Sequence, residues 1–195
     1  MRVIIGVDIG QKRDPTAICV AEPDRRVVGG REEAHFLIRY LARLPLGTPY
    51  TRVAATVGEI TAAAARRTGS APTLYVDATG VGQPIVDLLR ERADRATIKA
   101  VYFTRGDRRS EAGDAVTLGK AYLVSLLQGL LQQGRIHLPR TAEAEALARE
   151  LLDYEIQVDE NGTDRYGAFK VGTHDDLVTA LGLTVQEKPT QLWFA

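Results

Sequence analysis

Short runs of apolar residues recur along the chain, and most of them are too short to be helices. Residues 3–9 are apolar almost throughout, which is typical of a central strand buried on both faces. A polar turn separates this run from the next one, and the two together predict a hairpin. Strands are predicted over residues 3–9, 16–22, 73–77, 97–103 and 135–138, with one more at 26–28 or 35–41.

Longer stretches repeat their apolar residues every three or four positions, which is the spacing of one helix face. Gly69 closes the first of these stretches, and Thr141 is placed to cap the fourth. Helices are predicted over residues 51–68, from 83 onward, and over 116–133, 141–152 and 174–186.

The order of these elements is an early hairpin followed by alternating strands and helices. This order predicts an α/β fold in which a mixed β-sheet carries helices on both faces. The turn pair Asn161-Gly162 predicts a second hairpin over about 153–171. Because no linker or repeat divides the 195 residues, we expect a single domain over 1–195 with this hairpin as an insertion.

The net charge of the chain bears on how it could bind nucleic acid. Lys and Arg number 25 and Asp and Glu number 25, so the formal net charge is zero. Neutralisation of phosphates is the main sequence-independent source of nucleic-acid affinity, so the whole chain is not expected to hold DNA tightly through its net charge. A local basic groove is compatible with a zero sum, since the distribution of charge matters more than the total.

Other classes are excluded by features that the sequence lacks. Cys19 is the single cysteine, which rules out a disulfide or a thiolate metal cluster within the chain. No apolar run approaches the ~20 residues that cross a bilayer, and the N-terminus does not have the layout of a signal peptide. We therefore expect a soluble, intracellular protein with no membrane partner. The phosphate-binding loop of nucleoside triphosphatases is also absent.

Two aspartates stand at the ends of predicted buried strands. Asp8 closes the first strand and Asp77 closes a later one. Taken alone, Asp8 would cap the turn into the hairpin and Asp77 would begin a loop, both of which are common uses of Asp. Ligands gather at the carboxyl ends of strands in open α/β sheets. Two carboxylates at such ends, from distant segments, favour a functional site.

A third acidic position precedes the last predicted helix. His174, Asp175 and Asp176 come just before an apolar stripe that would dock this helix on the sheet. Capping and the helix dipole explain one aspartate at a helix start, but explain two adjacent ones less well. Asp175 and Asp176 are both candidate ligands. His174 is a candidate to bind metal or to orient a water, and is equally explained as a structural residue at the helix start.

Carboxylates in this number suit one chemistry in particular. Mg²⁺ and Mn²⁺ prefer carboxylate and water oxygens. Two such ions about 3.5–4 Å apart activate a water and stabilise the leaving oxygen of a phosphodiester. We predict that two Mg²⁺ or Mn²⁺ ions are bridged by Asp8, with Asp77 on one ion and Asp175 or Asp176 on the other.

These motifs, taken in order, resemble the nuclease domain of phage terminase large subunits. The resemblance implies a ribonuclease H-like fold and an endonuclease, dependent on Mg²⁺ or Mn²⁺, that cuts concatemeric viral DNA during genome packaging. Asp8, Asp77, Asp175 and Asp176 match the acidic cluster of that family. Asp14 resembles an accessory acidic position and is equally explained as a turn residue. The segments that carry the resemblance are Val7-Asp-Ile-Gly10, Asp14-Pro-Thr-Ala17, Val76-Asp-Ala-Thr-Gly-Val-Gly82, Gly162-Thr-Asp-Arg-Tyr166 and His174-Asp-Asp-Leu-Val-Thr-Ala180.

The resemblance also implies partners and a place of action. They are double-stranded DNA, a terminase ATPase domain, the small terminase subunit and the portal, in the cytoplasm of the bacterial host cell. Terminase large subunits carry an ATPase motor before the nuclease, and this sequence shows none. The chain is thus expected to be either the excised nuclease domain or a stand-alone relative. Zero net charge fits the first case, because the motor would supply the grip on DNA.

Cationic side chains near the predicted site are candidates for DNA contact. Arg105, Arg108 and Arg109 lie in a predicted polar loop over 104–113, and a solvated loop is the plain alternative. Arg165 and Lys170 lie on the second hairpin, just before the acidic helix, and are better placed to hold a DNA backbone near the metals.

Two other functions use similar residues. A Holliday-junction resolvase-like nuclease of the same fold would share the acidic set, and a preference for branched junctions would distinguish it. An actin- or sugar-kinase-like ATP-binding protein also places Asp-x-Gly turns after strands, but it needs a longer chain for its two lobes and leaves Asp175 and Asp176 unexplained.

Overall fold

Eight strands form one mixed sheet in the computed structural model, which describes residues 2–10, 14–80, 83–158, 164–167 and 174–186. The strand order across the sheet is β6-β7-β5-β4-β1-β2-β3-β8. Strands β1 and β2 are antiparallel, as are β2 and β3, and β6 and β7, whereas the remaining neighbours are parallel. The strands are β1 (Ile4–Asp8), β2 (Ala17–Val28), β3 (Arg31–Arg43), β4 (Thr73–Asp77), β5 (Thr97–Thr104), β6 (Arg109–Ala112), β7 (Ala115–Gly119) and β8 (Ile136–His137).

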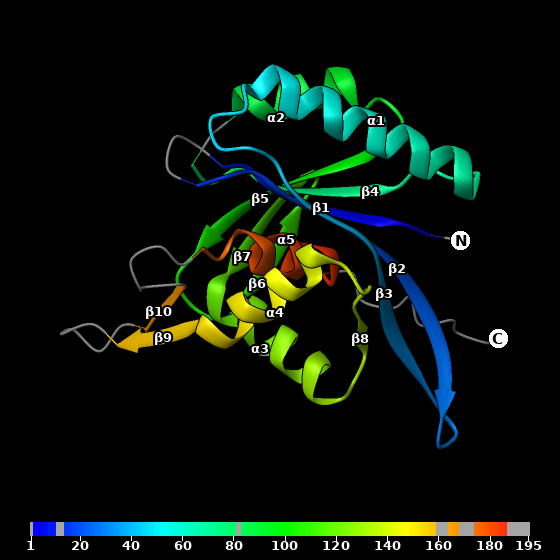
Figure 1. Ribbon diagram of the computed structural model, residues 1–195, viewed down its shortest axis with the longest axis vertical. Coiled ribbons are helices and arrows are strands. Elements are labelled where there is room, and N and C mark those ends of the chain that lie inside the picture. Colours follow the sequence, from blue (N-terminus) through cyan, green and yellow to red (C-terminus); the bar gives the residue numbers. More distant parts are fainter. Residues whose placement is uncertain (1, 11–13, 81–82, 159–163, 168–173, 187–195) are drawn as a thin grey trace.

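Helices cover both faces of this sheet, which confirms the predicted architecture. Figure 1 shows α1 and α2 on one face and α3, α4 and α5 on the other. The helices are α1 (Tyr50–Thr68), α2 (Gln83–Arg92), α3 (Lys120–Gln132), α4 (Ala142–Asp153) and α5 (Asp176–Thr184). None of the described helices is long and apolar enough to span a membrane.

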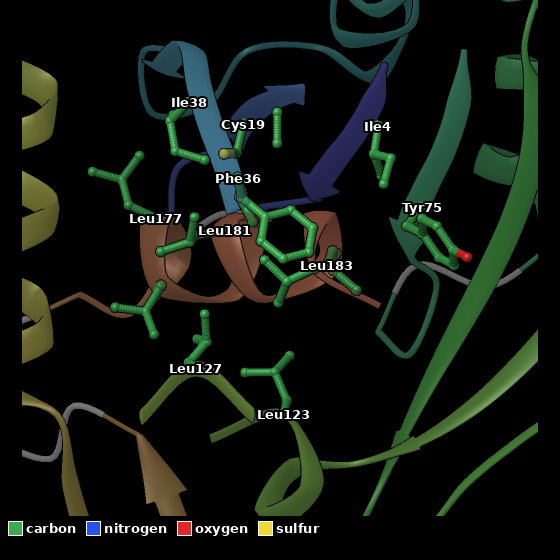
Figure 2. Close-up of a cluster of buried hydrophobic side chains, with 14 of the residues drawn as sticks. Ile4, Cys19, Phe36, Ile38, Tyr75, Leu123, Leu127, Leu177, Leu181 and Leu183 are labelled. Carbon is green, nitrogen blue, oxygen red and sulfur yellow. The ribbon is translucent and has the colours of Figure 1, made fainter. Parts of the chain in front are cut away.

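The two faces of the sheet carry two separate cores, because successive side chains of a strand point to opposite faces. On β1, Ile5 and Val7 pack in the cluster under α1 and α2, whereas Ile4 joins the cluster under the other three helices. Figure 2 shows this second cluster around α5, where Leu181 and Leu183 are fully buried. Helix α5 is thus held between the sheet and the outer helices.

A glycine allows α5 to lie directly on β1. A Cβ atom added at Gly6 would stand 2.1 Å from the carbonyl oxygen of Ala180 and 2.9 Å from the Cβ of Leu183. Any side chain at this position would push the helix away from the strand. The close approach fixes the start of α5 relative to the end of β1.

The early hairpin is longer than the sequence pattern predicts. Strand β2 continues to Val28 and β3 runs from Arg31 to Arg43, so the two alternative segments for a third strand both belong to this ribbon. The turn between them contains Gly29 and Gly30, both with positive φ (57° and 79°). Charged residues fill the outer part because a ribbon that extends past the sheet does not bury either face.

The helix predicted over 116–133 is wrong in its first four residues. Residues 115–119 form β7, which pairs with β5, and part of the loop predicted over 104–113 is the edge strand β6. Val116 and Leu118 alternate in the manner of a strand, but their spacing also fits a helix that continues to residue 133. A Cβ atom at Gly119 would stand 2.2 Å from the carbonyl oxygen of Gly106, so this glycine marks the change from strand to helix.

Other predicted boundaries agree with the structure. The helix over 51–68 ends at Gly69, which has a φ of 70°. Thr141 caps α4 by accepting a hydrogen bond from the N–H of Ala144 at 3.2 Å. Within the hairpin predicted over 153–171, β9 (Glu155–Val158) pairs antiparallel with β10 (Asp164–Gly167). Residue 153 ends α4, and residues 159–163 and 168–171 lie outside the described residues.

Candidate metal centre

The sheet topology brings Asp8 and Asp77 to the same edge. Strands β1 and β4 are parallel neighbours in which Val7 is opposite Val76, so the aspartates that end both strands stand side by side. Strands β3, β5 and β7 run in the same direction as β1 and end at this edge too. The predicted pairing of two strand-end carboxylates is therefore present.

The start of α5 adds Asp175 and Asp176 to this edge. A cavity of about 790 Å³ opens there, and these two residues line it together with Asp8, Asp14 and Asp77. The other walls come from the turn after β1 and from the segment that leads into α1, with the lining residues Ile9, Gly10, Gly47, Thr48, Pro49, Tyr50 and Gly80. All four aspartates of the predicted acidic cluster thus face one space.

Asp8 has a strongly perturbed carboxyl. Burial raises its pKa well above the ordinary value, and the negative charges of Asp77, Asp175 and Asp176 raise this pKa further. Lys120, at the start of α3, opposes the shift. A carboxylate in this position is costly without a cation, and that cost is what a bound metal ion would relieve.

Asp77 has a second role in the turn after β4. One of its oxygens, Oδ1, accepts a hydrogen bond from the N–H of Thr79 at 2.8 Å. Burial raises its pKa, whereas the hydrogen bonds to Thr79 and the charge of Lys120 lower it. Asp77 therefore begins the loop after β4, as its position in the sequence predicts, and it also lines the cavity.

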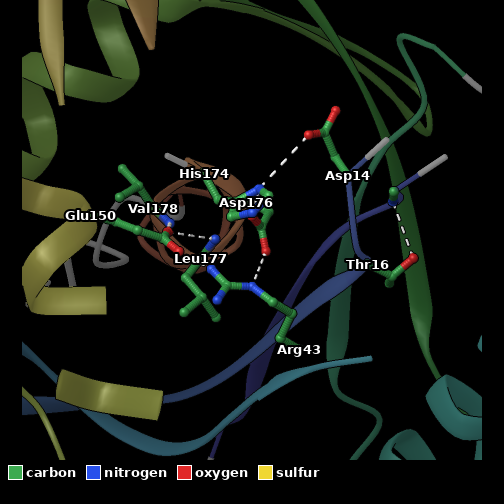
Figure 3. Close-up of polar contacts among 9 residues, drawn as sticks. Asp14, Thr16, Arg43, Glu150, His174, Asp176, Leu177 and Val178 are labelled. Atoms are coloured by element: carbon green, nitrogen blue, oxygen red, sulfur yellow. Dashed lines mark hydrogen bonds and ion pairs between the residues drawn. The ribbon is translucent and has the colours of Figure 1, made fainter. Parts of the chain in front are cut away.

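Asp176 is held by a partner that the sequence did not indicate. The Nε of Arg43 donates to Asp176 Oδ2 at 2.6 Å, and the guanidinium also bonds to Oε1 of Glu150. Figure 3 shows Arg43 reaching from the end of β3 to α5. The other oxygen of Asp176, Oδ1, is buried and has no hydrogen-bond partner among the described residues. The two members of the acidic pair thus differ, since Asp176 is buried and Asp175 is half-buried.

The two accessory candidates lie beside the cluster. The Nδ1 of His174 is 3.9 Å from Oδ1 of Asp14 and 3.8 Å from Oδ1 of Asp176 (Figure 3). Asp14 lines the cavity with a side chain that is 72% exposed. Asp14 is therefore on the exposed side of the cavity, whereas the Nδ1 of His174 is buried between Asp14 and Asp176, with no hydrogen-bond partner among the described residues.

Three residues of the centre were not found from the sequence. Lys120 offsets the charge of Asp8 and Asp77, while Arg43 and Glu150 contact α5 from two other elements. The first follows a strand that was assigned to a helix. The other two act over 133 and 27 residues of chain, a distance at which no local pattern reports contact.

The five residues predicted to contact DNA do not all lie at the same place. Arg105 and Arg108 are exposed between β5 and β6, at the edge of the sheet that carries the carboxylates. Arg109 bonds to Glu111 on the same strand. The side chain of Arg165 and the whole of Lys170 lie outside the described residues.

The donor set fits a hard divalent cation, since it consists of carboxylates around a polar cavity. A bound cation would give the buried Oδ1 of Asp176 a partner. It would also offset the cost of the negative charge on Asp8, whose pKa is raised. Within the described ranges, no three Asp, Glu, His or Cys side chains converge closely enough to enclose an ion. Binding would therefore need the carboxylates to draw together around it.

The domain has a mixed β-sheet with helices on both faces. Its acidic residues lie at the carboxyl ends of the central strands and at the start of the last helix. This arrangement defines the class of ribonuclease H-like domains. A family model described as the terminase RNaseH-like domain matches residues 5–188. The chain therefore belongs to this family. The match favours the terminase interpretation over the resolvase-like and ATP-binding alternatives.

Solved structures share the fold at low sequence identity. The large terminase nuclease of thermophilic phage G20c is 21% identical with a TM-score of 0.64, covering 96% of this chain and 83% of that one. The nuclease domain of the bacteriophage SPP1 large terminase, with bound Mn, is 14% identical with a TM-score of 0.56, covering 94% and 85%. The human cytomegalovirus terminase nuclease domain is 13% identical with a TM-score of 0.58, covering 94% and 81%. The G20c nuclease has also been solved with bound magnesium and with bound cobalt. No curated protein sequence matches the chain significantly.

Proposed function

We propose that this chain is the metal-dependent endonuclease domain of a terminase large subunit, which cuts concatemeric viral DNA during genome packaging. The observation that carries the proposal is the meeting of Asp8, Asp77, Asp175 and Asp176 around one cavity in a domain of this family. Structures of relatives with bound magnesium or Mn support the choice of Mg²⁺ or Mn²⁺.

The four aspartates would hold two ions, with Asp8 between them, Asp77 on one side and the start of α5 on the other. Bound ions supply an activated water and stabilise the leaving oxygen of a phosphodiester. Lys120 and Arg43 limit the repulsion among the carboxylates, since each carries a positive charge beside them. His174 and Asp14, beside the cluster, are proposed as accessory residues that orient water or metal.

We propose that DNA reaches this centre over the carboxyl edge of the sheet. Arg105 and Arg108 are exposed at that edge and would contact phosphates, while Arg165 and Lys170 are proposed contacts from the hairpin. The remaining proposed partners are the terminase ATPase domain, the small terminase subunit and the portal, in the cytoplasm of the bacterial host cell. Zero net charge supports a need for such partners, because the domain alone has no excess charge with which to hold DNA.

Cleavage of supercoiled plasmid by the purified chain tests this function. With Mn²⁺ we expect nicking and linearisation with little sequence preference, and none with EDTA. Asp8→Asn should abolish cleavage, because it removes the central charge and keeps the volume. Asp87→Asn is the matched control, since this aspartate is exposed on α2 and should leave cleavage unchanged. Intact plasmid at high protein concentration, or selective cutting of four-way junctions, would contradict the proposal.

A further inference from the structure

The first turn of α5 is capped by a residue of another helix. Glu150 of α4 is 8% exposed, and its Oε2 accepts hydrogen bonds from the backbone N–H groups of Leu177 at 3.1 Å and Val178 at 3.4 Å. These are the two N–H groups that an N-cap side chain ordinarily binds. Asp175 occupies the N-cap position of α5 but makes no side-chain capping hydrogen bond. The carboxylate of Glu150 thus accepts the hydrogen bonds that an N-cap aspartate ordinarily accepts.

The same carboxylate connects to the rest of the centre through Arg43. Its second oxygen, Oε1, bonds to Arg43, whose Nε holds Asp176 (Figure 3). The Glu150 and Asp176 side chains are only 9% and 4% exposed, and Arg43 offsets the charge of both. Arg43 stands in register with Asp8 across the sheet, since both are opposite Ala17 in their pairs. One chain of contacts therefore joins α4, β3 and α5 behind the cavity.

We infer that Glu150 and Arg43 are positioning residues of the acidic centre. Glu150 caps α5 in place of Asp175, so that Asp175 lines the cavity instead of folding back on its own helix. Arg43 holds Asp176 by one oxygen and leaves the other, Oδ1, available to a ligand. The inference rests on the proposed function for what the cavity binds, whereas the exchange of capping roles is a property of the fold.

The physical reason lies in the competition for the same two N–H groups. Aspartate is among the best N-cap residues, and Asp175 is one residue before the first turn of α5. If Glu150 is removed, the N–H groups of Leu177 and Val178 lose their acceptor and Asp175 is next to them. We expect Asp175 to take them, which keeps the helix capped and removes a carboxylate from the cavity.

Thermal unfolding without metal tests the exchange of roles. In the unmodified chain with EDTA, Asp175→Ala removes no helix cap, because Glu150 binds the N–H groups of Leu177 and Val178. In the Glu150→Ala background, Asp175→Ala removes the replacement cap, so it should lower Tm by roughly 2–4 °C more than in the unmodified chain, the effect of a lost cap in a domain of this size. Equal effects of Asp175→Ala in the two backgrounds would overturn the inference.

A matched control comes from the same helix. Glu145 is exposed on α4, so Glu145→Ala should leave the effect of Asp175→Ala as it is in the unmodified chain. If Glu150→Ala does not fold, Glu150→Gln serves instead, since it keeps the volume but places an amide between Arg43 and the helix N–H groups. The Asp175→Ala effect should then change in the same direction.

Mn²⁺ binding measured by calorimetry tests the consequence for the centre. Glu150→Ala should weaken Mn²⁺ binding by about 10–100-fold, as is usual for residues that orient metal ligands. Asp175→Ala should weaken binding in the unmodified chain but add little in the Glu150→Ala background, because Asp175 has already left the cavity. Full additivity of the two effects would contradict the positioning role.

Arg43 is tested by a substitution that keeps its charge. Arg43→Lys cannot bridge two carboxylates with a planar fork, so it should weaken Mn²⁺ binding several-fold. Arg39→Lys, on the same strand and paired with Glu22 at the surface, is the control and should have no effect. Unchanged binding in Arg43→Lys would contradict the role of Arg43. If the unmodified chain neither binds Mn²⁺ nor cuts DNA, the proposed function fails, but the metal-free Tm comparison still decides the capping role.

Discussion

At the scale of the residue, the centre is defined by carboxylates held in a place where they repel one another. At Asp8, burial and the charges of three neighbouring aspartates all raise the pKa. Lys120 and Arg43 reduce the repulsion from two sides. A site of this kind lowers the stability of the domain in exchange for affinity toward a cation.

The raised pKa of Asp8 predicts that the free energy of unfolding depends on pH. The pKa of Asp8 in the folded chain lies above its ordinary value of 3.8, so its favourable contribution is complete below that value. It is lost as the pH rises through the folded-state pKa. In EDTA, Asp8→Asn should therefore be more stable than the unmodified chain at pH 7, and the difference should vanish in acid. Denaturant unfolding across pH measures this, and parallel curves for the two proteins would count against it.

The sequence pattern indicates the carboxylates but not the residues that hold them. Asp8 and Asp77 were recognised because each ends an apolar run, and Asp175 and Asp176 because they begin one. The sequence around Arg43 is ordinary for the end of a strand, and the sequence around Glu150 is ordinary for a helix. Only the folded chain brings both residues to α5. The contact of Arg43 distinguishes Asp176 from Asp175, and no local sequence pattern shows it.

At the scale of the element, the centre depends on how α5 lies against β1. The helix carries two aspartates at its start and is buried along almost its whole length. Gly6 sets the closeness of the approach, since a Cβ atom there would meet the backbone of Ala180. A small change at this contact would move the acidic start of α5 away from Asp8.

Gly6→Ala should therefore destabilise the domain and impair the centre together. Overpacking of this kind costs about 1–3 kcal/mol, and here the obstacle is backbone, which yields less than a side chain. Gly129→Ala is the control, because nothing lies within 4 Å of a Cβ atom at that position in α3. It should stabilise by about 0.5–1 kcal/mol, the helical preference of Ala over Gly. Denaturant unfolding distinguishes the two, and equal stabilities would refute the assigned contact.

The one serious error of element assignment also has a physical cause. Residues 115–119 pair with β5, and the sequence shows only two large apolar residues there, Val116 and Leu118, two positions apart. Those two positions suit a strand, but they also extend the following helix by one turn. The partner strand β5 decided the outcome, and a local pattern does not show which strand will lie alongside a segment.

At the scale of the whole molecule, the chemistry gathers at one edge of the sheet. Strands β1, β3, β4, β5 and β7 all end there, and α3 and α5 begin there. This edge carries the four aspartates together with Lys120, Arg43 and the exposed Arg105 and Arg108. Opposite charges are thus placed close together in a chain whose net charge is zero. The overall architecture was predictable because element order and strand-end carboxylates both point to this edge.

The most direct test is diffraction from crystals soaked in Mn²⁺, with the ions located by anomalous scattering. We predict two peaks in the cavity, one beside Asp77 and one beside the start of α5, with Asp8 between them. Crystals of Asp8→Asn should lose at least one of the two peaks. An empty cavity at a Mn²⁺ concentration that supports plasmid cleavage, or ions bound elsewhere on the domain, would contradict the account.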